Sequence, residues 1–158
     1  MTFINQEFSN LSATVTNSAY QTTTATYQYL SGSRILYTPE INSTYVYYQF
    51  LFQRTYGTTD DNLIHLKLVS GSNISQVNSS PADIEGSYVN TGDNLKYTRK
   101  TCFYRKLIPT WEGEKVLQLN FRHYSSDHVT DVNRIDLWSG TTGLTINSNS
   151  FLLVSSIF

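Results

Sequence analysis

Residues 44–54, Thr-Tyr-Val-Tyr-Tyr-Gln-Phe-Leu-Phe-Gln-Arg, alternate as a β-strand does, yet both faces are rich in apolar and aromatic side chains. One face carries Val46, Tyr48, Phe50 and Phe52, and the other carries Tyr45, Tyr47 and Leu51 with Gln49 and Gln53 between them. A strand with two apolar faces has to be covered on both. Because a small sandwich covers only one of them, we expect another layer or another copy of the chain on the second face.

Composition sets the class of protein. The 158 residues match one domain, and Cys102 is the single cysteine, so the chain folds without an internal disulfide and suits a reducing cytosol. Charged residues make up 15%, below the roughly 25% that is usual, and the formal net charge is -1. The whole molecule therefore has no strong electrostatic attraction to nucleic acid or to an anionic membrane, and we expect neither as a partner.

The N-terminal residues predict an arm and not a targeting signal. They contain neither a basic region nor an apolar core of the kind that signal peptides have. No window approaches the roughly 18 apolar residues of a membrane span. Residues 1–19 are rich in Ser, Thr and Asn, with apolar side chains at Phe3, Ile4, Phe8 and Leu11. We expect this arm to dock onto a partner through those four residues.

Strand-like runs separated by turn-forming residues fill the rest of the chain. They cover residues 20–30, 34–37, 44–54, 63–69, 96–108, 115–124, 132–138 and 151–158, with a weaker one around Tyr88. Helical periodicity is nearly absent. The prediction is one all-β domain over residues 20–158, an antiparallel jelly-roll sandwich of about eight to ten strands.

Two runs give the expected orientation of their faces. In residues 115–124, Leu117, Leu119 and Phe121 alternate with Gln118, Asn120 and Arg122, which predicts a strand that is wet on one side. In residues 151–158, Leu152, Val154 and Phe158 oppose Phe151, Leu153 and Ile157, so both faces are apolar. The second pattern is typical of a central strand, and its exposed end would promote aggregation unless the domain or a subunit interface covered it.

Candidate catalytic groups are few. His123, Asp127, His128 and Asp131 lie close together and could hold a divalent metal, but their spacing matches neither the helical His-Glu-x-x-His pattern nor a closed zinc site. We interpret them as polar loop residues, and Glu112 and Glu114 around Gly113 as parts of an exposed turn. The prediction is a protein without catalytic residues, metal or cofactor.

A basic stretch contains Lys96, Arg99, Lys100, Arg105 and Lys106, interleaved with aromatic residues. It could bind nucleic acid, an acidic glycan or an acidic protein. Because the rest of the chain offsets these charges, we interpret it as a solvated strand whose charges discourage edge pairing.

Residues 44–54, the stretch Pro-Thr-Trp-Glu-Gly-Glu-Lys-Val-Leu-Gln-Leu-Asn-Phe-Arg-His-Tyr at 109–124 and the closing strand at 151–157 resemble trimeric jelly rolls of the tumour-necrosis-factor and C1q type. The nearest resemblance within that type is to short virion proteins of tailed phages. It implies a non-enzymatic homotrimer that decorates the capsid and stabilises the head shell. The implied trimer interface contains Tyr45, Tyr47, Leu51, Leu152, Val154 and Phe158.

The same resemblance implies partners and a location. The N-terminal arm would contact the major capsid protein or another virion protein, and the chain would be made in the host cytoplasm and end in the virion. An alternative is a receptor- or glycan-binding knob of a tail fibre, in which Trp111 and Trp138 stack on sugar rings. We interpret both tryptophans first as core or interface anchors.

Overall fold

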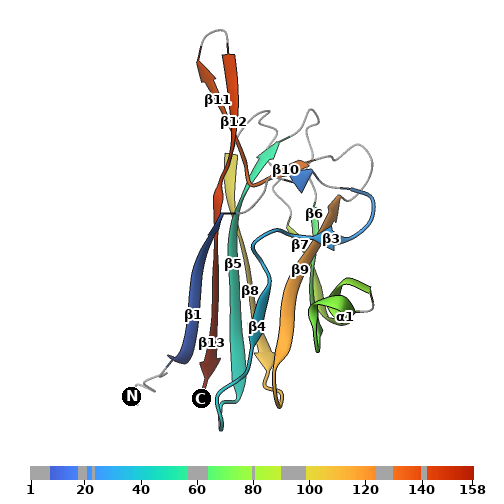
Figure 1. Cartoon of the computed structure of the whole chain (residues 1–158), viewed down its shortest axis with the longest axis vertical. Coiled ribbons are helices and arrows are strands. Elements are labelled where there is room, and N and C mark those ends of the chain that lie inside the picture. The colour runs from blue at the N-terminus through green and yellow to red at the C-terminus, as the bar shows by residue number, and fades with distance from the viewer. Residues whose placement is uncertain are drawn as a thin grey trace.

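The computed structural model has two antiparallel sheets packed face to face (Figure 1). It describes residues 8–17, 21–22, 24–56, 64–79, 81–89, 99–123, 130–139 and 142–158. Within these ranges only the backbone is described for residues 8–17, 54–56, 85–89, 99–100, 130, 134–139 and 142–147. The described residues form an all-β sandwich, as the sequence predicts.

The first sheet is built around β5 and is called the β5 sheet. Its strands are, in order, β1 (Phe8–Asn17), β13 (Asn149–Ile157), β5 (Tyr45–Tyr56) and β8 (Arg99–Pro109). The short strand β10 (Thr130–Val132) pairs with the last residues of β5, and β2 (Gln21–Thr22) pairs with β10. The pairing confirms β13 as a central strand, because β1 and β5 lie on its two sides.

The second sheet is built around β9 (Lys115–His123) and is called the β9 sheet. On one side of β9 lie β3 (Gln28–Tyr29) and β4 (Ile35–Tyr37), and on the other lie β6 (Ile64–Gly71) and β7 (Ala82–Val89). A short helix, α1 (Ile74–Ser79), connects β6 to β7 and buries Val77 against Val69 and Val116. The hairpin of β11 (Arg134–Ser139) and β12 (Thr142–Asn147) projects beyond both sheets (Figure 1).

The core lies between the two sheets and follows the predicted alternation. Val46, Tyr48, Phe50 and Phe52 of β5 are all 0% exposed. They pack against apolar residues of the opposite sheet, which include Ile64, Leu66, Leu68, Leu117, Leu119 and Phe121. Each fully buried aliphatic or aromatic side chain of this kind contributes about 1.5–3 kcal/mol to stability.

Several predicted boundaries are wrong. Residues 8–17 were expected in an arm, but they form β1 and pair with β13 along its length. Among the described residues of the run at 20–30, two short strands, β2 and β3, are separated by bends. The connections between predicted strands contain α1 at Ile74–Ser79 and β12 at Thr142–Asn147. Phe8 and Leu11, two of the four residues expected to dock the arm, therefore belong to a strand of the sheet. Phe3 and Ile4 lie outside the described residues, and their docking stays a prediction.

The predicted strand at 132–138 is interrupted at Asn133. This residue has a φ of 60°, a left-handed conformation in which Asn is tolerated better than most side chains. Its N–H donates to the Gln53 carbonyl at 2.8 Å, its carbonyl accepts from Ser148 N–H at 2.9 Å, and its side-chain oxygen accepts from Ser150 Oγ at 3.1 Å. Asn133 therefore separates β10, which belongs to the β5 sheet, from the projecting hairpin.

Candidate interaction surfaces

The outer face of the β5 sheet is an apolar surface that the strand register assembles. Residues directly opposite each other in a ladder share a face. Leu51 lies between Phe103 of β8 and Phe151 of β13, and Tyr47 is opposite Leu107. Three strands that are distant in the sequence thus bring their apolar alternate positions together, on the side that faces away from the core.

These side chains keep a large part of their area exposed. Phe103 is 49% exposed, Leu107 is 50% exposed and Tyr45 is 46% exposed. The residues between them, Tyr47, Leu51, Phe151 and Leu153, are half-buried. A contiguous apolar surface on a sheet marks an interaction site more often than a free surface.

The polar groups on this face are already hydrogen-bonded to one another. Gln49 Oε1 accepts from the Tyr47 hydroxyl at 2.9 Å and from Arg105 Nε at 3.1 Å, and the Arg105 guanidinium lies 5.0 Å from the centre of the Phe103 ring. Arg105 carries the only charge among the side chains described on this face. Two or three copies of such a face can approach with little charge repulsion.

The predicted trimer interface divides between two environments. Tyr45, Tyr47 and Leu51 are on the outer face, as the prediction requires, and Phe158 is 48% exposed at the end of the chain. Leu152 and Val154 are different, because they are 2% and 0% exposed in the domain core. They have no area left for a partner, so they are not interface residues. Phe103 and Leu107 lie on the same face as Tyr47 and Leu51 but are not in the predicted set, because their position depends on the long-range pairing of β8 with β5.

The aromatic layer beneath this face contains tyrosines with shifted acidity. Burial raises the pKa of Tyr104 to about 12, and burial raises the pKa of Tyr48 well above 10.0 although its hydroxyl donates to the Ser33 carbonyl at 2.5 Å. The two rings meet edge to face, with centroids 6.2 Å apart. Both rings belong to the core, and their burial keeps the phenols neutral at pH values where a free tyrosine begins to ionise.

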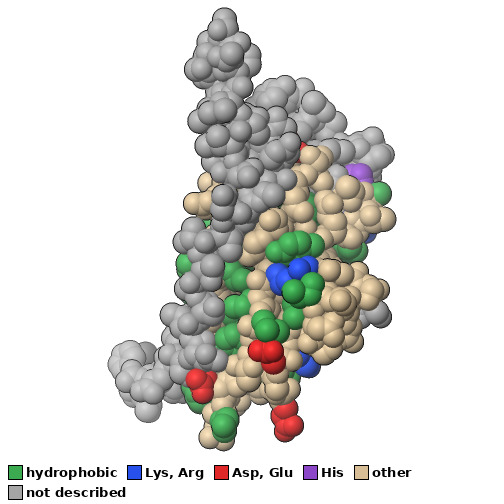
Figure 2. Space-filling model, in the orientation of Figure 1, with side chains coloured by type: hydrophobic (Ala, Val, Ile, Leu, Met, Phe, Trp, Pro, Cys, Tyr) green, Lys and Arg blue, Asp and Glu red, His purple; other side chains and the backbone are tan. Residues whose placement is uncertain are grey.

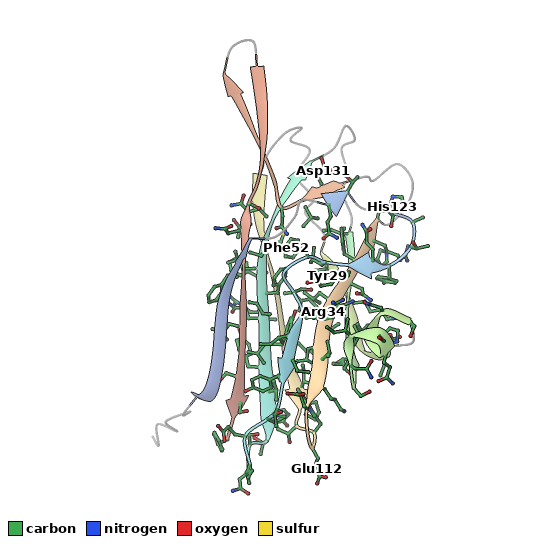
Figure 3. The ribbon with its side chains drawn as sticks, viewed as in Figure 1. Tyr29, Arg34, Phe52, Glu112, His123 and Asp131 are labelled. Carbon is green, nitrogen blue, oxygen red and sulfur yellow. The ribbon has the colours of Figure 1, made fainter. Side chains whose placement is uncertain are left out.

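The candidate metal residues are only partly described. Asp127 and His128 lie outside the described residues. His123 is buried, and Asp131 accepts a hydrogen bond from Thr22 Oγ1 at 2.6 Å, near the junction of β10 with β2 (Figure 3). Among the residues with described side chains, no group of three His, Cys, Asp or Glu is placed to hold a metal. Whether the complete cluster binds one stays a prediction.

Trp111 is half-buried and packs against the core, with its ring 6.4 Å from that of Tyr37 in an edge-on arrangement. The Lys115 ammonium lies 5.7 Å from the centre of the Trp111 ring. The indole also lines a cavity of about 460 Å³, together with Glu40 and Asn42. Trp111 is therefore an anchor with one side open to a hollow, and the side chain of Trp138 lies outside the described part.

The basic stretch is distributed along an edge. Within the described pairing, β8 has β5 as its neighbour on one side only. Arg105 is on the outer face, and Lys96 lies outside the described residues. For Arg99 and Lys100 the backbone alone is described. The position at a sheet edge fits the interpretation of a solvated strand whose charges oppose further pairing.

No described helix has the length and apolar character that crossing a membrane requires. Glu112 and Glu114 are exposed beside Gly113, whose φ is 75°, so they occupy the expected turn before β9. No protein-family model matches the chain, and a search of curated proteins finds no match.

Proposed function

We propose that the protein is a non-enzymatic structural component of a virion, a homotrimer that binds the capsid surface and stabilises the head shell. Subunits associate through the outer face of the β5 sheet. The single observation behind this proposal is the row of half-exposed apolar residues on that face, which includes Tyr45, Phe103 and Leu107. Their partner is a second copy of the chain, because the face is apolar and nearly uncharged over its described side chains.

The size of the face suits a stable interface. Four strands at a spacing of about 4.8 Å give a width of about 19 Å. The ladder of β5 with β8 extends over eleven residue pairs, or about 37 Å at roughly 3.4 Å per residue. The product is about 700 Å², close to the roughly 800 Å² that each partner buries in a standard interface. One face is therefore large enough to hold copies together.

The strand order supports a jelly roll of the tumour-necrosis-factor and C1q type. From β4 onward the chain crosses between sheets repeatedly: β4 is in the β9 sheet, β5 in the β5 sheet, β6 and β7 in the β9 sheet, β8 in the β5 sheet and β9 in the β9 sheet. Repeated crossing of this kind is what two interlocked Greek keys require. The proposed subunit contact uses the sheet that contains both β1 and β13.

Mass action is the means by which the proposed shell binding would stabilise the head. A protein that binds the assembled shell and not its separate subunits lowers the free energy of the assembled state. A trimer makes three such contacts, so weak individual contacts give slow dissociation. The first residues of the chain, with Phe3 and Ile4, are the segment we propose for this contact.

The test of self-association is sedimentation velocity on the wild type and on Leu107→Asp. Placing an unpaired carboxylate in the interface costs about 3 kcal/mol or more, so the variant should sediment as a monomer at concentrations where the wild type is trimeric. Ile41→Asp is the matched control, because Ile41 is 85% exposed in the turn between β4 and β5 and lies off the face. A monomeric wild type, or equal behaviour of the two variants, would refute the proposed interface.

Quantitative mass spectrometry of purified particles separates the two virion roles. A copy number comparable to that of the major shell protein supports decoration. A copy number equal to that of the tail proteins would replace decoration with the fibre-knob alternative. Absence from the particles would overturn both.

A further inference from the structure

The outer face of the β9 sheet has a polar centre, in contrast with the apolar outer face of the β5 sheet. Along β9, Val116, Gln118, Asn120 and Arg122 point away from the core. The prediction that this face is wet is wrong at Gln118 and Asn120, which are 1% and 9% exposed. Figure 2 shows basic side chains between hydrophobic ones over β4 and β9, with acidic side chains towards one end.

A cavity of about 580 Å³ opens on this face between β4 and α1. Leu36 and Ile74 form its walls, and they are 52% and 51% exposed. Val116 lies at its floor, opposite Leu36 in the ladder. Arg34 and Glu114 line the two ends of the cavity. Arg34 contacts Gln118, and Glu114 comes four residues before Gln118 in the chain, or about 13 Å along a strand. The volume is within the range of about 300–1,000 Å³ that small-molecule sites have.

Arg34 is held rigidly by neutral groups. Its Nε donates to Gln118 Oε1 at 2.7 Å, and its Nη2 donates to Asn78 Oδ1 at 2.9 Å. Its guanidinium lies 4.3 Å from the centre of the Tyr29 ring, and Gln118 is itself fixed by donating to Asn120 Oδ1 at 2.6 Å. Tyr29 belongs to β3, and Arg34 immediately precedes β4 (Figure 3).

The charge of Arg34 has no carboxylate partner among the described residues, where the one ion pair joins Lys67 to Asp83. The hydrogen bonds to Gln118 and Asn78 use two of the five N–H donors of the guanidinium, so three remain for a ligand. A half-buried, oriented and uncompensated guanidinium beside a cavity is suited to bind a planar oxyanion through two parallel hydrogen bonds.

We propose that this cavity binds an acidic sugar, a monosaccharide unit with one carboxylate such as a uronic or nonulosonic acid. Arg34 binds the carboxylate. Leu36 and Ile74 contact the C–H face of the ring, and the sugar hydroxyls bond to Ser75 and Glu114, both of which line the cavity. Glu114 accepts from hydroxyls but repels a second negative charge, so polyphosphates fit poorly.

The rest of the face favours the same orientation of the ligand. Tyr27 is 38% exposed, with Lys67 Nζ 5.3 Å and Arg122 Cζ 5.2 Å from the centre of its ring. Arg122 lies on the Arg34 side of the cavity, away from Glu114, because Gln118 and Asn120 separate it from Val116 on β9. The potential is therefore positive at one end and negative at the other, which places the carboxylate towards Arg34.

This inference does not rest on the proposed function. The cavity and the proposed subunit interface are on opposite sides of the sandwich, so trimer formation leaves the cavity open. Leu107→Asp tests the assembly, and variants of Arg34 test the sugar site. Each can fail while the other holds.

The experiment is saturation-transfer NMR and calorimetry with the methyl glycosides of N-acetylneuraminic acid and glucuronic acid. We expect millimolar affinity for at least one of them and none for methyl glucoside. Arg34→Gln should weaken binding about tenfold or more, because it removes a charge-assisted bidentate contact. Lys115→Gln is the matched control, because it makes the same change of charge at a side chain that packs over Trp111 and is neither in the cavity lining nor on the proposed subunit interface. It should bind as the wild type does.

A second variant covers the case in which Arg34→Gln does not fold. Ile74→Glu adds a like charge to an exposed wall of the cavity and should also abolish binding of the acidic sugars. Equal binding of neutral and acidic sugars, binding unaffected by both variants, or binding of N-acetylglutamate as tight as that of the sugars would overturn the proposal. Absence of binding by either glycoside to the wild type would overturn it as well.

Discussion

Tyr48 and Tyr104 offer a test of the core in which one chemical change has opposite effects. Both rings are buried and pack edge to face. The Tyr48 hydroxyl donates to the Ser33 carbonyl at 2.5 Å, whereas the Tyr104 hydroxyl is buried without a partner among the described residues. Replacing either residue by Phe keeps the ring and removes only the hydroxyl.

The expected magnitudes follow from the cost of unsatisfied polar groups. Tyr104→Phe removes an unpaired buried hydroxyl and should stabilise the fold by about 1 kcal/mol, which raises Tm by roughly 2–4 °C in a chain of this size. Tyr48→Phe removes a hydrogen bond and leaves the Ser33 carbonyl unpaired, so it should destabilise the fold by about 1–3 kcal/mol. Thermal unfolding followed by circular dichroism, at one fixed protein concentration, measures both changes.

The pH dependence gives an independent check on Tyr104. The pKa of its phenol is raised by burial from 10.0 to about 12, so the unfolded chain releases this proton before the folded chain does. The stability that this difference in pKa contributes to the folded state is fully present below about pH 10 and is lost as the pH rises towards about 12. The advantage of Tyr104→Phe over the wild type should therefore grow by about 1 kcal/mol between about pH 8 and about pH 11. A Tyr104→Phe variant that is less stable than the wild type at both pH values would refute this reasoning.

Three further substitutions or modifications probe other positions. Gly71→Ala should destabilise the fold by about 1–3 kcal/mol, because the new Cβ would lie 2.7 Å from Val77 Cγ2 and 3.0 Å from the Val77 backbone nitrogen. Urea unfolding measures the change, and an unchanged midpoint would mean that α1 can shift. Ser156→Ala should cost about 1–2 kcal/mol, since Ser156 Oγ accepts from Glu40 N–H at 2.9 Å, and Ser156→Thr should recover part of the loss if that bond matters. Cys102 is 5% exposed, so a thiol reagent such as Ellman's should label it only as fast as the protein unfolds, and labelling within the mixing time would show that β8 is open.

The sequence is sufficient to predict the inner faces of the main strands. In β5 and β9 the period of two distinguishes buried from outward positions correctly at Phe50, Phe52, Leu117 and Leu119, all of which are 0% exposed. Hydrophobic burial dominates the free energy there, so local pattern and tertiary environment agree. The same agreement does not extend to the outward positions.

Outward positions depend on which strands become neighbours, and a pattern within one strand does not contain that information. The two apolar faces of the last strand left open whether the domain or a subunit covers them, and the resemblance placed Leu152 and Val154 in an interface. The register turns both side chains to the core. Gln118 was expected in water, but Arg34, which immediately precedes β4 and lies 84 positions earlier in the chain, contacts it. Residues 8–17 lack a strong alternation of polar and apolar residues, and they form a strand because β13 offers an open edge.

The difference between the two outer faces connects the two proposals. The apolar face has one described charge, and it gains most from contact with its own copies. On the other face, Gln118 and Asn78 orient Arg34 without neutralising its charge, so an anionic ligand would bind there more favourably than a neutral one. A trimer built on the first face would present three copies of the second to the outside. A millimolar sugar site, weak in one subunit, would then bind a glycan-coated surface with an avidity that exceeds each single affinity by about 10²-fold or more, provided that the spacing of the sugars allows simultaneous contact.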